Sequence, residues 1–600
     1  MTDEKLENSL NLALRVPEAE RERSLDLKTG YDPAEKSWDL IVKYTGDIQR
    51  LAAGAVQITE LLGGYAVVTL PEVLVEPFSR QPEITYVEKP KGLCFASAEG
   101  RQESCVSGLQ TGAAGLFGAG IMIAVIDSGI DYRLEDFRNR DGTSRIAWLW
   151  DQTIDGNPPA GYRIGTEFSA EQINEALRTG NPLGADGSDS GDPENHGTPV
   201  AAIAAGNGGR GGIRYRGMAP ESVLLVVRLE NRDGGFPRTT ELLMGIDYAV
   251  RKMLETGVPM VINLSFGNSY GSHEGTSLLE TYLDLVSGLG RLTICVGSGN
   301  EGIGFGHAAG QLQNPKERPL TNPGLTGGSG QSGSPGENEG TEIIRFAVGL
   351  YETGLNLQIW KSYVDEVAIM LIDPSGNASG RIDERTGIQR ITVGETELLI
   401  YYGEPKPYSV RQEIYITFLP ESNFITPGVW TIRLVPGKIV DKSWQMWLPA
   451  QSALNVGTAF LKPDSATTLT IPSTASLVIT VAAYDALTFS YADFSGRGPA
   501  QMYEGGGVPK PDLAAPGVRV TAPATGGGYA EFTGTSFATP FVTGSAALLM
   551  EWGIVKGQDL YLYGEKVKAY LRRGARELPG YGRWPNGEMG YGEDVIIRLH

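Results

Sequence analysis

The chain has 600 residues, of which 41% are hydrophobic, 20% are charged and 80 are glycine. This length exceeds what one hydrophobic core usually serves, so we expect a soluble chain of about two to four domains. The formal net charge of −20 argues against a nucleic-acid partner, which calls for a basic face, and against anionic membrane surfaces.

The first residues, Met-Thr-Asp-Glu-Lys-Leu-Glu-Asn, are acidic and lack the apolar segment of a signal peptide. No apolar run of about 18 residues is evident, so we expect no signal peptide and no membrane span. The cysteines are sparse and odd in number, which fits a reducing compartment better than a disulfide framework; they are Cys94, Cys105 and Cys295. Cys295 follows Arg-Leu-Thr-Ile, and we expect it to pack in the core.

The first part of the chain predicts an α+β domain, which we place at residues 1–96. Residues 38–45 alternate like a strand, and residues 58–70 read as two strands interrupted at Gly63-Gly64. A short helix over residues 72–80 and a strand over residues 84–88 complete the pattern. The polar stretch of residues 96–107 then reads as a linker.

From Gly118 onward, short apolar runs alternate with helical patterns. We expect strands at residues 121–126, 223–229, 260–264 and 292–296, and helices at residues 198–206, 239–256 and 277–288. Strands that are apolar throughout and alternate with helices indicate a parallel sheet covered on both faces. The sequence therefore predicts an α/β fold with a doubly wound parallel sheet, whose first part we assign to residues 97–310.

A second β-rich region interrupts this pattern. Residues 310–341 are rich in Gly, Asn, Pro and Ser, which marks a boundary, and about eight short alternating strands follow up to residue 448. Such a series is typical of a β-sandwich. We assign an inserted, jelly-roll-like domain to residues 311–450 and the second part of the α/β fold to residues 451–600, which includes an apolar helix over residues 537–552.

Three short motifs lie far apart in a fixed order: Ile-Asp127-Ser-Gly, Asn-His196-Gly-Thr and Gly-Thr-Ser536-Phe-Ala-Thr-Pro. They supply a carboxylate, an imidazole and a hydroxyl, the set that lets a neutral alcohol attack an acyl carbon. The predicted positions support this use: Asp127 ends a strand, His196 opens a helix of small residues, and Ser536 begins the last apolar helix, whose N-terminus attracts negative charge.

The chain order Asp, His, Ser and the residues around each motif resemble the subtilisin family of serine proteases over roughly residues 118–310 and 454–552. The resemblance implies a serine endopeptidase that needs no cofactor and acts on protein or peptide substrates. It also implies that the N-terminal domain is a propeptide, an intramolecular chaperone and inhibitor retained after self-cleavage within residues 96–107. The insertion resembles that of the Csp germination proteases of clostridia, which implies a cytoplasmic or spore-associated enzyme.

The same resemblance assigns the remaining site residues. Asn300, in Gly-Ser-Gly-Asn-Glu-Gly, matches the side chain that completes the oxyanion hole. The substrate edge and the primary specificity pocket are assigned to Ser265, Phe266, Gly267, Gly297, Ser298 and Gly299. Gly234, within Asp-Gly-Gly, is assigned to the opposite substrate edge.

Two questions stay open at the level of sequence. The stretch of residues 186–194 holds four acidic side chains between Asp127 and His196; it could narrow access or bind a cation, but no set of calcium ligands can be assembled, so we assign no metal. Two other functions compete with proteolysis: a non-catalytic receptor with this fold, or a binding protein acting through aromatic residues of the insertion.

Overall fold

A computed structural model describes residues 4–95, 115–184, 187–230, 237–314, 340–385, 387–404, 406–499 and 509–594. The chain divides into two compact units. One comprises residues 1–28 and 305–464, and the other residues 29–304 and 465–600. The division separates residues 1–28 from the predicted domain of residues 1–96, a boundary that the sequence pattern did not mark.

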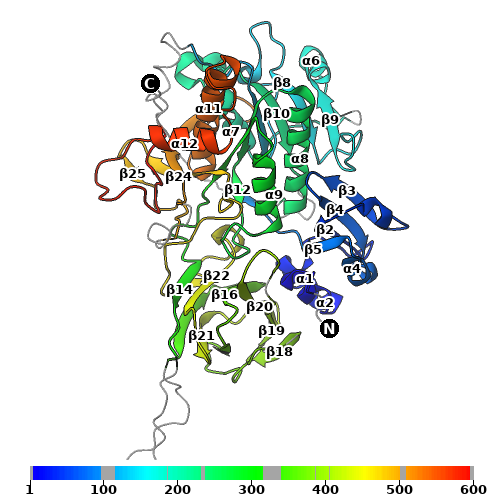
Figure 1. Ribbon diagram of the computed structural model, residues 1–600, viewed down its shortest axis with the longest axis vertical. Coiled ribbons are helices and arrows are strands. Elements are labelled where there is room, and N and C mark those ends of the chain that lie inside the picture. Colours follow the sequence, from blue (N-terminus) through cyan, green and yellow to red (C-terminus); the bar gives the residue numbers. More distant parts are fainter. Residues whose placement is uncertain are drawn as a thin grey trace, which may run out of the picture. The chain divides into compact units, whose positions relative to one another are not determined.

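Residues 29–95 form an α+β domain, which we call the N-terminal domain (Figure 1). Its elements are β1 (Tyr31–Asp32), β2 (Ser37–Tyr44), η1 (Ile48–Leu51), β3 (Gln57–Leu61), β4 (Tyr65–Pro71), α4 (Glu72–Ser79), β5 (Ile84–Glu88) and β6 (Cys94–Phe95). The antiparallel sheet has the order β1-β2-β4-β3, with β5 also paired to β2. The expected strand pair around Gly63-Gly64 is β3 and β4, where both glycines adopt the positive φ that a tight turn requires.

The α/β domain, within residues 115–304 and 465–594, is built on a nine-stranded sheet of order β25-β24-β13-β11-β7-β10-β8-β9, with β26 beside β24. The strands are β7 (Met122–Asp127), β8 (Ile146–Asp151), β9 (Thr166–Ser169), β10 (Val223–Arg228), β11 (Met260–Leu264), β13 (Leu292–Gly297), β24 (Ile479–Asp485), β25 (Ser490–Tyr491) and β26 (Leu513–Pro516). The central strands pair in parallel, which confirms the doubly wound sheet. Cys295 is fully buried in β13, and burial raises the pKa of its thiol to about 12.

Helices cover both faces of this sheet. Helices α7 (Gly197–Ala205) and α11 (Thr535–Met550) pack together on one face, and α8 (Thr239–Thr256) and α9 (Leu278–Ser287) lie on the other. The remaining elements are η2 (Glu135–Phe137), α6 (Ala170–Thr179), η3 (Gly209–Tyr215), β12 (Phe266–Gly267), β27 (Val520–Pro523), β28 (Tyr529–Phe532), η5 (Glu551–Val555) and α12 (Glu565–Gly574).

One helical stretch of the α/β domain corrects the expectation that the chain has no apolar run of about 18 residues. Residues Thr535–Val555 are long and apolar enough to cross a membrane by length and composition alone. However, 78% of the 18-residue window that meets this criterion is buried inside the protein, and residues of the stretch join the core cluster formed with α7 and the sheet. The apolar character therefore reflects a central core helix.

The other unit holds the inserted β domain (residues 305–464), whose strands form a six-stranded and a four-stranded sheet. They are β14 (His307–Gln311), β15 (Glu342–Val348), β16 (Leu355–Ser362), β17 (Val367–Ile372), β18 (Ile388–Val393), β19 (Thr396–Tyr402), β20 (Arg411–Pro420), β21 (Gly428–Pro436), β22 (Ser443–Trp447) and β23 (Ala459–Phe460), with η4 (Gln451–Ala453) between the last two. The predicted bounds of 311–450 are too narrow, because β14 pairs with β22 and β23 with β15.

The aromatic residues of the β domain belong largely to its core. The aromatic residues considered for a sugar platform are Trp360, Tyr401, Tyr402, Tyr408, Trp430 and Trp444, and all of them except Tyr408 are buried. Core packing accounts for Tyr402, Trp430 and Trp444, which belong to the core cluster of the sandwich, whereas Trp360 and Tyr401 are buried outside that cluster.

Residues 4–28 pack on the β domain as helices α1 (Asn8–Ala13), α2 (Glu18–Arg21) and α3 (Leu25–Lys28). Leu10 and Leu12 of α1 are fully buried, and α1 contacts β19 and β20. Asn8 donates a hydrogen bond to Glu413 at 2.9 Å, and Tyr415 donates to Asp26. The first 28 residues are therefore a structural part of the β domain unit.

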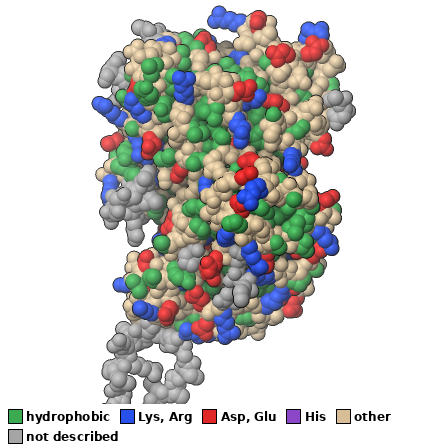
Figure 2. All heavy atoms as spheres, turned by 45° about the vertical axis from the view of Figure 1, so that its right-hand side comes forward, with side chains coloured by type: hydrophobic (Ala, Val, Ile, Leu, Met, Phe, Trp, Pro, Cys, Tyr) green, Lys and Arg blue, Asp and Glu red, His purple; other side chains and the backbone are tan. Residues whose placement is uncertain are grey.

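The surface carries both signs of charge. Figure 2 shows Lys and Arg side chains interspersed with Asp and Glu on the face that it presents. No broad basic area is visible on that face among the described residues, in keeping with the net charge of −20.

Candidate active site

Asp127 and His196 form a buried pair at the carboxyl edge of the sheet. Asp127 is the last residue of β7, and its Oδ1 lies 2.6 Å from Nδ1 of His196. The Ser128 amide donates to the same oxygen at 2.8 Å, and the exposed fractions of the two side chains are 0% and 3%. A carboxylate in this position fixes the tautomer of the imidazole and stabilises its protonated form.

Asp192 holds His196 and the start of α7 in place. Its Oδ2 accepts the Thr198 amide at 2.8 Å, and its Oδ1 accepts the His196 amide at 3.2 Å and the Ser128 hydroxyl at 2.6 Å. A carboxylate that binds the first amides of a helix satisfies donors that have no partner in the helix itself. Part of the acidic stretch of residues 186–194 is therefore a helix cap beside the imidazole.

Another acidic residue of that stretch, Asp189, is also explained by local contacts. It accepts hydrogen bonds from Tyr132 and Leu183 and pairs with Arg133. Within the described ranges, no group of three or more His, Cys, Asp or Glu side chains could hold a metal ion.

Ser536 lies in the first turn of α11 and faces the strand edge that follows β11. Its hydroxyl donates to the carbonyl of Ser265 at 2.7 Å, and the Ser265 hydroxyl donates to the carbonyl of Ser536 at 3.0 Å. The His196 ring lies 5.3 Å from the ring of Phe537, the next residue of α11. The imidazole of His196 therefore lies beside the first turn of α11, the turn that carries Ser536.

Asn300 is oriented by contacts with the same helix. Its Oδ1 accepts hydrogen bonds from the amide and the hydroxyl of Thr535, both at 3.1 Å. Because an amide N–H can only donate, these contacts settle which atom of the Asn300 side chain is oxygen. The Nδ2 group is then the donor that the side chain offers beside Ser536.

The end of the N-terminal domain runs between two edges of the α/β domain. Strand β6 pairs antiparallel with β12, with Phe95 opposite Phe266 and Cys94 opposite Gly267. On the other side, the Leu93 amide donates to Pro237 at 2.7 Å and the Thr239 amide donates to Lys91 at 2.9 Å. Residues 91–95 therefore occupy an extended groove by main-chain pairing, as a peptide added to a sheet edge does.

The other expected substrate residues lie near this groove with different roles. Ser298 accepts the Thr470 amide at 3.0 Å, and a Cβ built on Gly299 would meet the Thr470 side chain. Gly297 faces α11, because a Cβ there would lie 3.0 Å from the Thr539 hydroxyl. Gly234 and the expected self-cleavage linker of residues 96–107 lie outside the described residues.

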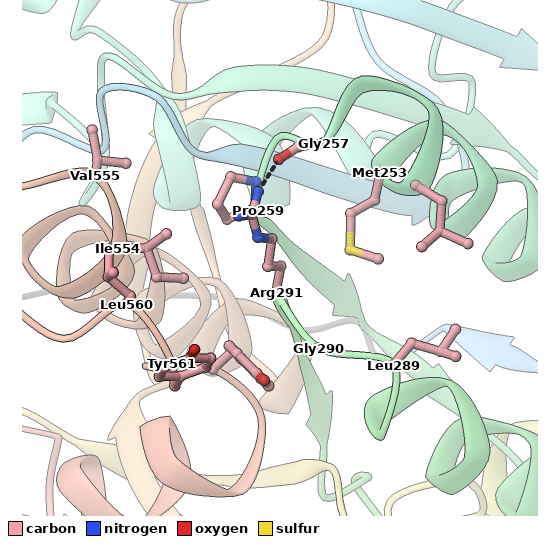
Figure 3. Close-up of a pocket in the computed structure, with 12 residues that line it drawn as sticks. Met253, Gly257, Pro259, Leu289, Gly290, Arg291, Ile554, Val555, Leu560 and Tyr561 are labelled. Atoms are coloured by element: carbon pink, nitrogen blue, oxygen red, sulfur yellow. Dashed lines mark hydrogen bonds between the residues drawn. The ribbon is translucent and has the colours of Figure 1, made fainter. Parts of the chain in front are cut away.

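A cavity of about 650 Å³ lies elsewhere in the α/β domain. Figure 3 shows its lining residues, among them Met253 on α8, Arg291 and Tyr561; Arg291 donates a hydrogen bond to the carbonyl of Gly257 at 2.8 Å. Pro259 and Arg291 precede β11 and β13, so this cavity is at the amino ends of the strands. It is remote from Asp127, which ends β7.

Comparisons with known proteins identify the family. A profile described as the Subtilase family matches residues 118–378 and 445–592. The chain belongs to the subtilase family. A further profile, described as the Csp protease B prodomain, matches residues 4–91 of this subtilase, so its N-terminal region is a propeptide of that type.

Among solved structures, the subtilase resembles that of the Clostridium perfringens CspB protease. The two are 31% identical with a TM-score of 0.72, and the match covers 82% of this chain and 94% of that one. The similarity supports the arrangement of propeptide, subtilase fold and inserted domain.

Two curated relatives come from Bacillus subtilis strain 168. The minor extracellular protease Vpr is 25% identical over 465 residues, or 73% of this chain, and the major intracellular serine protease is 29% identical over 192 residues, or 32%. The chain spans about half the length of each relative, 46% in both cases.

Three contributors to the site carry no signal in the sequence. Asp192 reads as one of several acidic loop residues, Thr535 as a helix cap, and Thr470 as part of a polar segment. Their roles depend on contacts across the fold, which residue spacing does not show.

Proposed function

We propose that this subtilase is a serine endopeptidase that uses Ser536 as nucleophile, His196 as general base and Asp127 as the group that orients His196. The observation that supports this most strongly is the buried contact of 2.6 Å between Asp127 and His196, next to a serine at the start of α11. Such a set can deprotonate a serine hydroxyl and form an acyl-enzyme.

In the proposed reaction, the Ser536 hydroxyl turns from the Ser265 carbonyl toward His196 and attacks the substrate carbonyl. Nδ2 of Asn300 and the Ser536 amide at the helix N-terminus stabilise the oxyanion. His196 then passes the proton to the leaving amine, and water hydrolyses the acyl-enzyme. All of these steps use protein groups and water.

The propeptide is proposed to be the first substrate and then a retained inhibitor. Residues 91–95 already pair with both edges of the groove beside Ser265, and this occupancy excludes other peptides. Opening the groove therefore requires removal of the propeptide.

We further propose that the mature enzyme cleaves a precursor protein during spore germination and is located in the cytoplasm or the spore. The support is the resemblance to the Csp proteases. Labelling of new amino termini in spore extracts treated with wild type or with Ser536→Ala would identify the substrate.

The catalytic assignment is tested by the self-cleavage rate of purified variants. Asp127→Asn should slow the reaction by about 10⁴-fold, because the imidazole loses its correct tautomer. His196→Ala and Ser536→Ala should be slowed at least as strongly. A non-catalytic receptor with this fold would leave wild type uncut, and that result would refute the proposal.

A further inference from the structure

Asn263 places a buried amide in a strand that otherwise consists of apolar residues. Strand β11 has the sequence Met-Val-Ile-Asn-Leu, and the Asn263 side chain is fully buried. A buried polar group destabilises the fold unless its donors and acceptors find partners. Because an apolar residue at this position would carry no such requirement, the contacts of the amide call for an explanation.

The contacts of Asn263 lead to two points on helix α11. Its Oδ1 accepts a hydrogen bond from the Thr543 hydroxyl at 2.8 Å. Its Nδ2 donates to the Ser265 hydroxyl at 2.9 Å, and this hydroxyl donates to the carbonyl of Ser536 at 3.0 Å. All four residues are buried. One amide is thus connected to two residues of α11 that lie about two helical turns apart.

The carbonyl of Ser536 depends on this connection because of Pro540. In an α-helix, the carbonyl of each residue accepts the amide hydrogen of the residue four positions later. For Ser536 that residue is Pro540, inside α11, and proline has no amide hydrogen. The Ser265 hydroxyl therefore supplies the donor that the helix cannot provide, in the turn that carries Ser536.

The Ser536 carbonyl also sets the direction of the hydrogen bonds around Asn263. A carbonyl only accepts, so the Ser265 hydroxyl uses its hydrogen for Ser536 and can only accept from Asn263. This requirement identifies the atom beside Ser265 as Nδ2 and the atom beside Thr543 as the accepting oxygen. A carboxylate at position 263 would reverse the bond to Ser265, because a carboxylate only accepts.

We propose that Asn263 is a positioning residue of the reaction, which holds the first turn of α11 in a fixed position along β11. The inference rests on the proposed function, in which that turn carries both the attacking hydroxyl and the Ser536 amide that stabilises the oxyanion. Asn263 acts through Ser265 and Thr543. Because a displacement of about 1 Å can lower a rate by about 10²-fold, a fixed position of this turn contributes to catalysis.

The test measures the self-cleavage rate of the full chain and, for the processed enzyme, the turnover and the Michaelis constant of a peptide substrate. Asn263→Asp should slow self-cleavage by about 10-fold or more, because the carboxylate takes the Ser265 hydrogen and leaves the Ser536 carbonyl without a donor. Turnover should fall by a similar factor. The Michaelis constant should stay unchanged, since the interaction that is lost positions the reacting groups.

A second substitution tests whether Asn263 acts through Ser265. Ser265→Ala removes the same donor from the Ser536 carbonyl. It should therefore slow self-cleavage by about 10-fold in wild type and have little further effect in the Asn263→Asp background, since the two residues form one connection. Fully additive effects would overturn the proposal, as would an Asn263→Asp variant that cuts itself at the wild-type rate.

If Asn263→Asp does not fold, Thr543 provides the comparison. Thr543→Val keeps the shape of threonine and removes the hydroxyl that binds Oδ1 of Asn263, so it should slow self-cleavage. Thr543→Ser keeps the hydroxyl and should be cut at close to the wild-type rate. Equal rates of the two Thr543 variants would overturn the proposal.

Thr293→Val is the matched control, because Thr293 is a buried threonine at the other end of α11. Its hydroxyl lies 3.5 Å from Sδ of Met550 and accepts the Gly564 amide at 3.1 Å. The substitution should lower the melting temperature about as much as Thr543→Val and leave the self-cleavage rate unchanged. An equal loss of rate in both variants would assign the effect to general loosening of α11 and overturn the proposal.

The outcomes separate this inference from the proposed function. A wild type that is cut, together with Asn263→Asp and Thr543→Val variants that are cut equally fast, would overturn only the role of Asn263. An uncut wild type would overturn both.

Discussion

The phenol of Tyr65 in the propeptide donates a hydrogen bond to the hydroxyl of Thr281 on α9 at 3.0 Å. On the neighbouring helix α8, Asp247 accepts the backbone amide of Leu62 at 2.8 Å. The two contacts attach the β3–β4 turn region to the pair of helices that covers one face of the catalytic sheet. We therefore expect these side chains to help hold the propeptide on the enzyme after cleavage.

Tyr65→Phe and Thr281→Val should each weaken propeptide retention, and the double variant should be little worse than either single one. A hydrogen bond of this kind contributes about 0.5–1.5 kcal/mol, and residues in direct contact are not additive. The measurement is the fraction of cleaved propeptide that stays with the enzyme on gel filtration in increasing urea.

Tyr44→Phe is the matched control for this cycle. The phenol of Tyr44 donates to Glu60 inside the propeptide at 2.8 Å. The effect of removing this hydroxyl on propeptide retention should therefore be the same with Thr281 or with Val at position 281. If the effects of Tyr65→Phe and Thr281→Val on propeptide retention were fully additive, the hydrogen bond between the two side chains would be unimportant for retention.

Asp192→Ala should lower both stability and turnover. The helix α7 loses a cap, which costs about 1 kcal/mol, and the backbone of His196 loses a partner at 3.2 Å. Thermal unfolding and self-cleavage rates measure the two effects. Glu194→Ala, an exposed acidic neighbour, should change neither, and an equal effect of both substitutions would point to general charge instead of capping.

Asn300→Asp should reduce turnover by about 10²–10³-fold, the size known for such a donor in the subtilisin family. The variant keeps an oxygen for Thr535 and lacks the Nδ2 donor, so the fold should be preserved. The Michaelis constant of a peptide substrate should change little, because the bond strengthens in the transition state. Unchanged turnover would remove Asn300 from the reaction.

Burial raises the pKa of Asp594 to about 7, with Glu593 nearby adding to the effect. The folded protein therefore keeps a proton on Asp594 that the unfolded chain releases near pH 4. Wild type should lose stability as the pH rises from about 4 to about 7. Relative to Asp594→Asn, its melting temperature should fall by several degrees over that interval and then stay level.

The control for this pH profile is Asp155→Asn, at an exposed position, which should track wild type throughout. A difference in melting temperature between wild type and Asp594→Asn that stays constant from pH 4 to pH 8 would contradict the buried, protonated state of Asp594.

The β domain should be removable together with residues 1–28, which pack on it. The Asp464 amide donates to the His307 carbonyl at 2.9 Å, so the two ends of the insertion lie side by side and a short Gly/Ser linker can replace residues 305–464. Deleting residues 1–28 as well should leave self-cleavage intact. Deleting residues 305–464 alone should cause aggregation, because Leu10 and Leu12 lose their cover. A folded double deletion that cannot cut itself would assign the unit of residues 1–28 and 305–464 a role in catalysis.

The sequence predicted the parts of the fold that are determined locally. Strands such as β11 and β13 are buried at every position and mostly apolar, and the three motifs around Asp127, His196 and Ser536 each end a strand or begin a helix. These features leave a pattern because burial on both faces and helix initiation act on consecutive residues.

The parts that could not be predicted depend on pairing across the fold. Strand β14 has the sequence His-Ala-Ala-Gly-Gln, which lacks an apolar alternation and becomes a strand because β22 pairs with it. Thr470 acquires its place only because Ser298 and Asn268 bind its segment from two sides. Helix α1 is stabilised by the β domain, which lies nearly three hundred residues later in the chain.

The most direct measurement is the intact mass and N-terminal sequence of purified wild type beside Ser536→Ala, both produced in a host lacking other proteases. Wild type should yield a propeptide and a mature fragment that begins within residues 96–107, and Ser536→Ala should remain a single chain. Ser545→Ala, a second serine on α11, should be cut like wild type. Finding Ser536→Ala cut at the same bond as wild type would contradict self-processing by this serine.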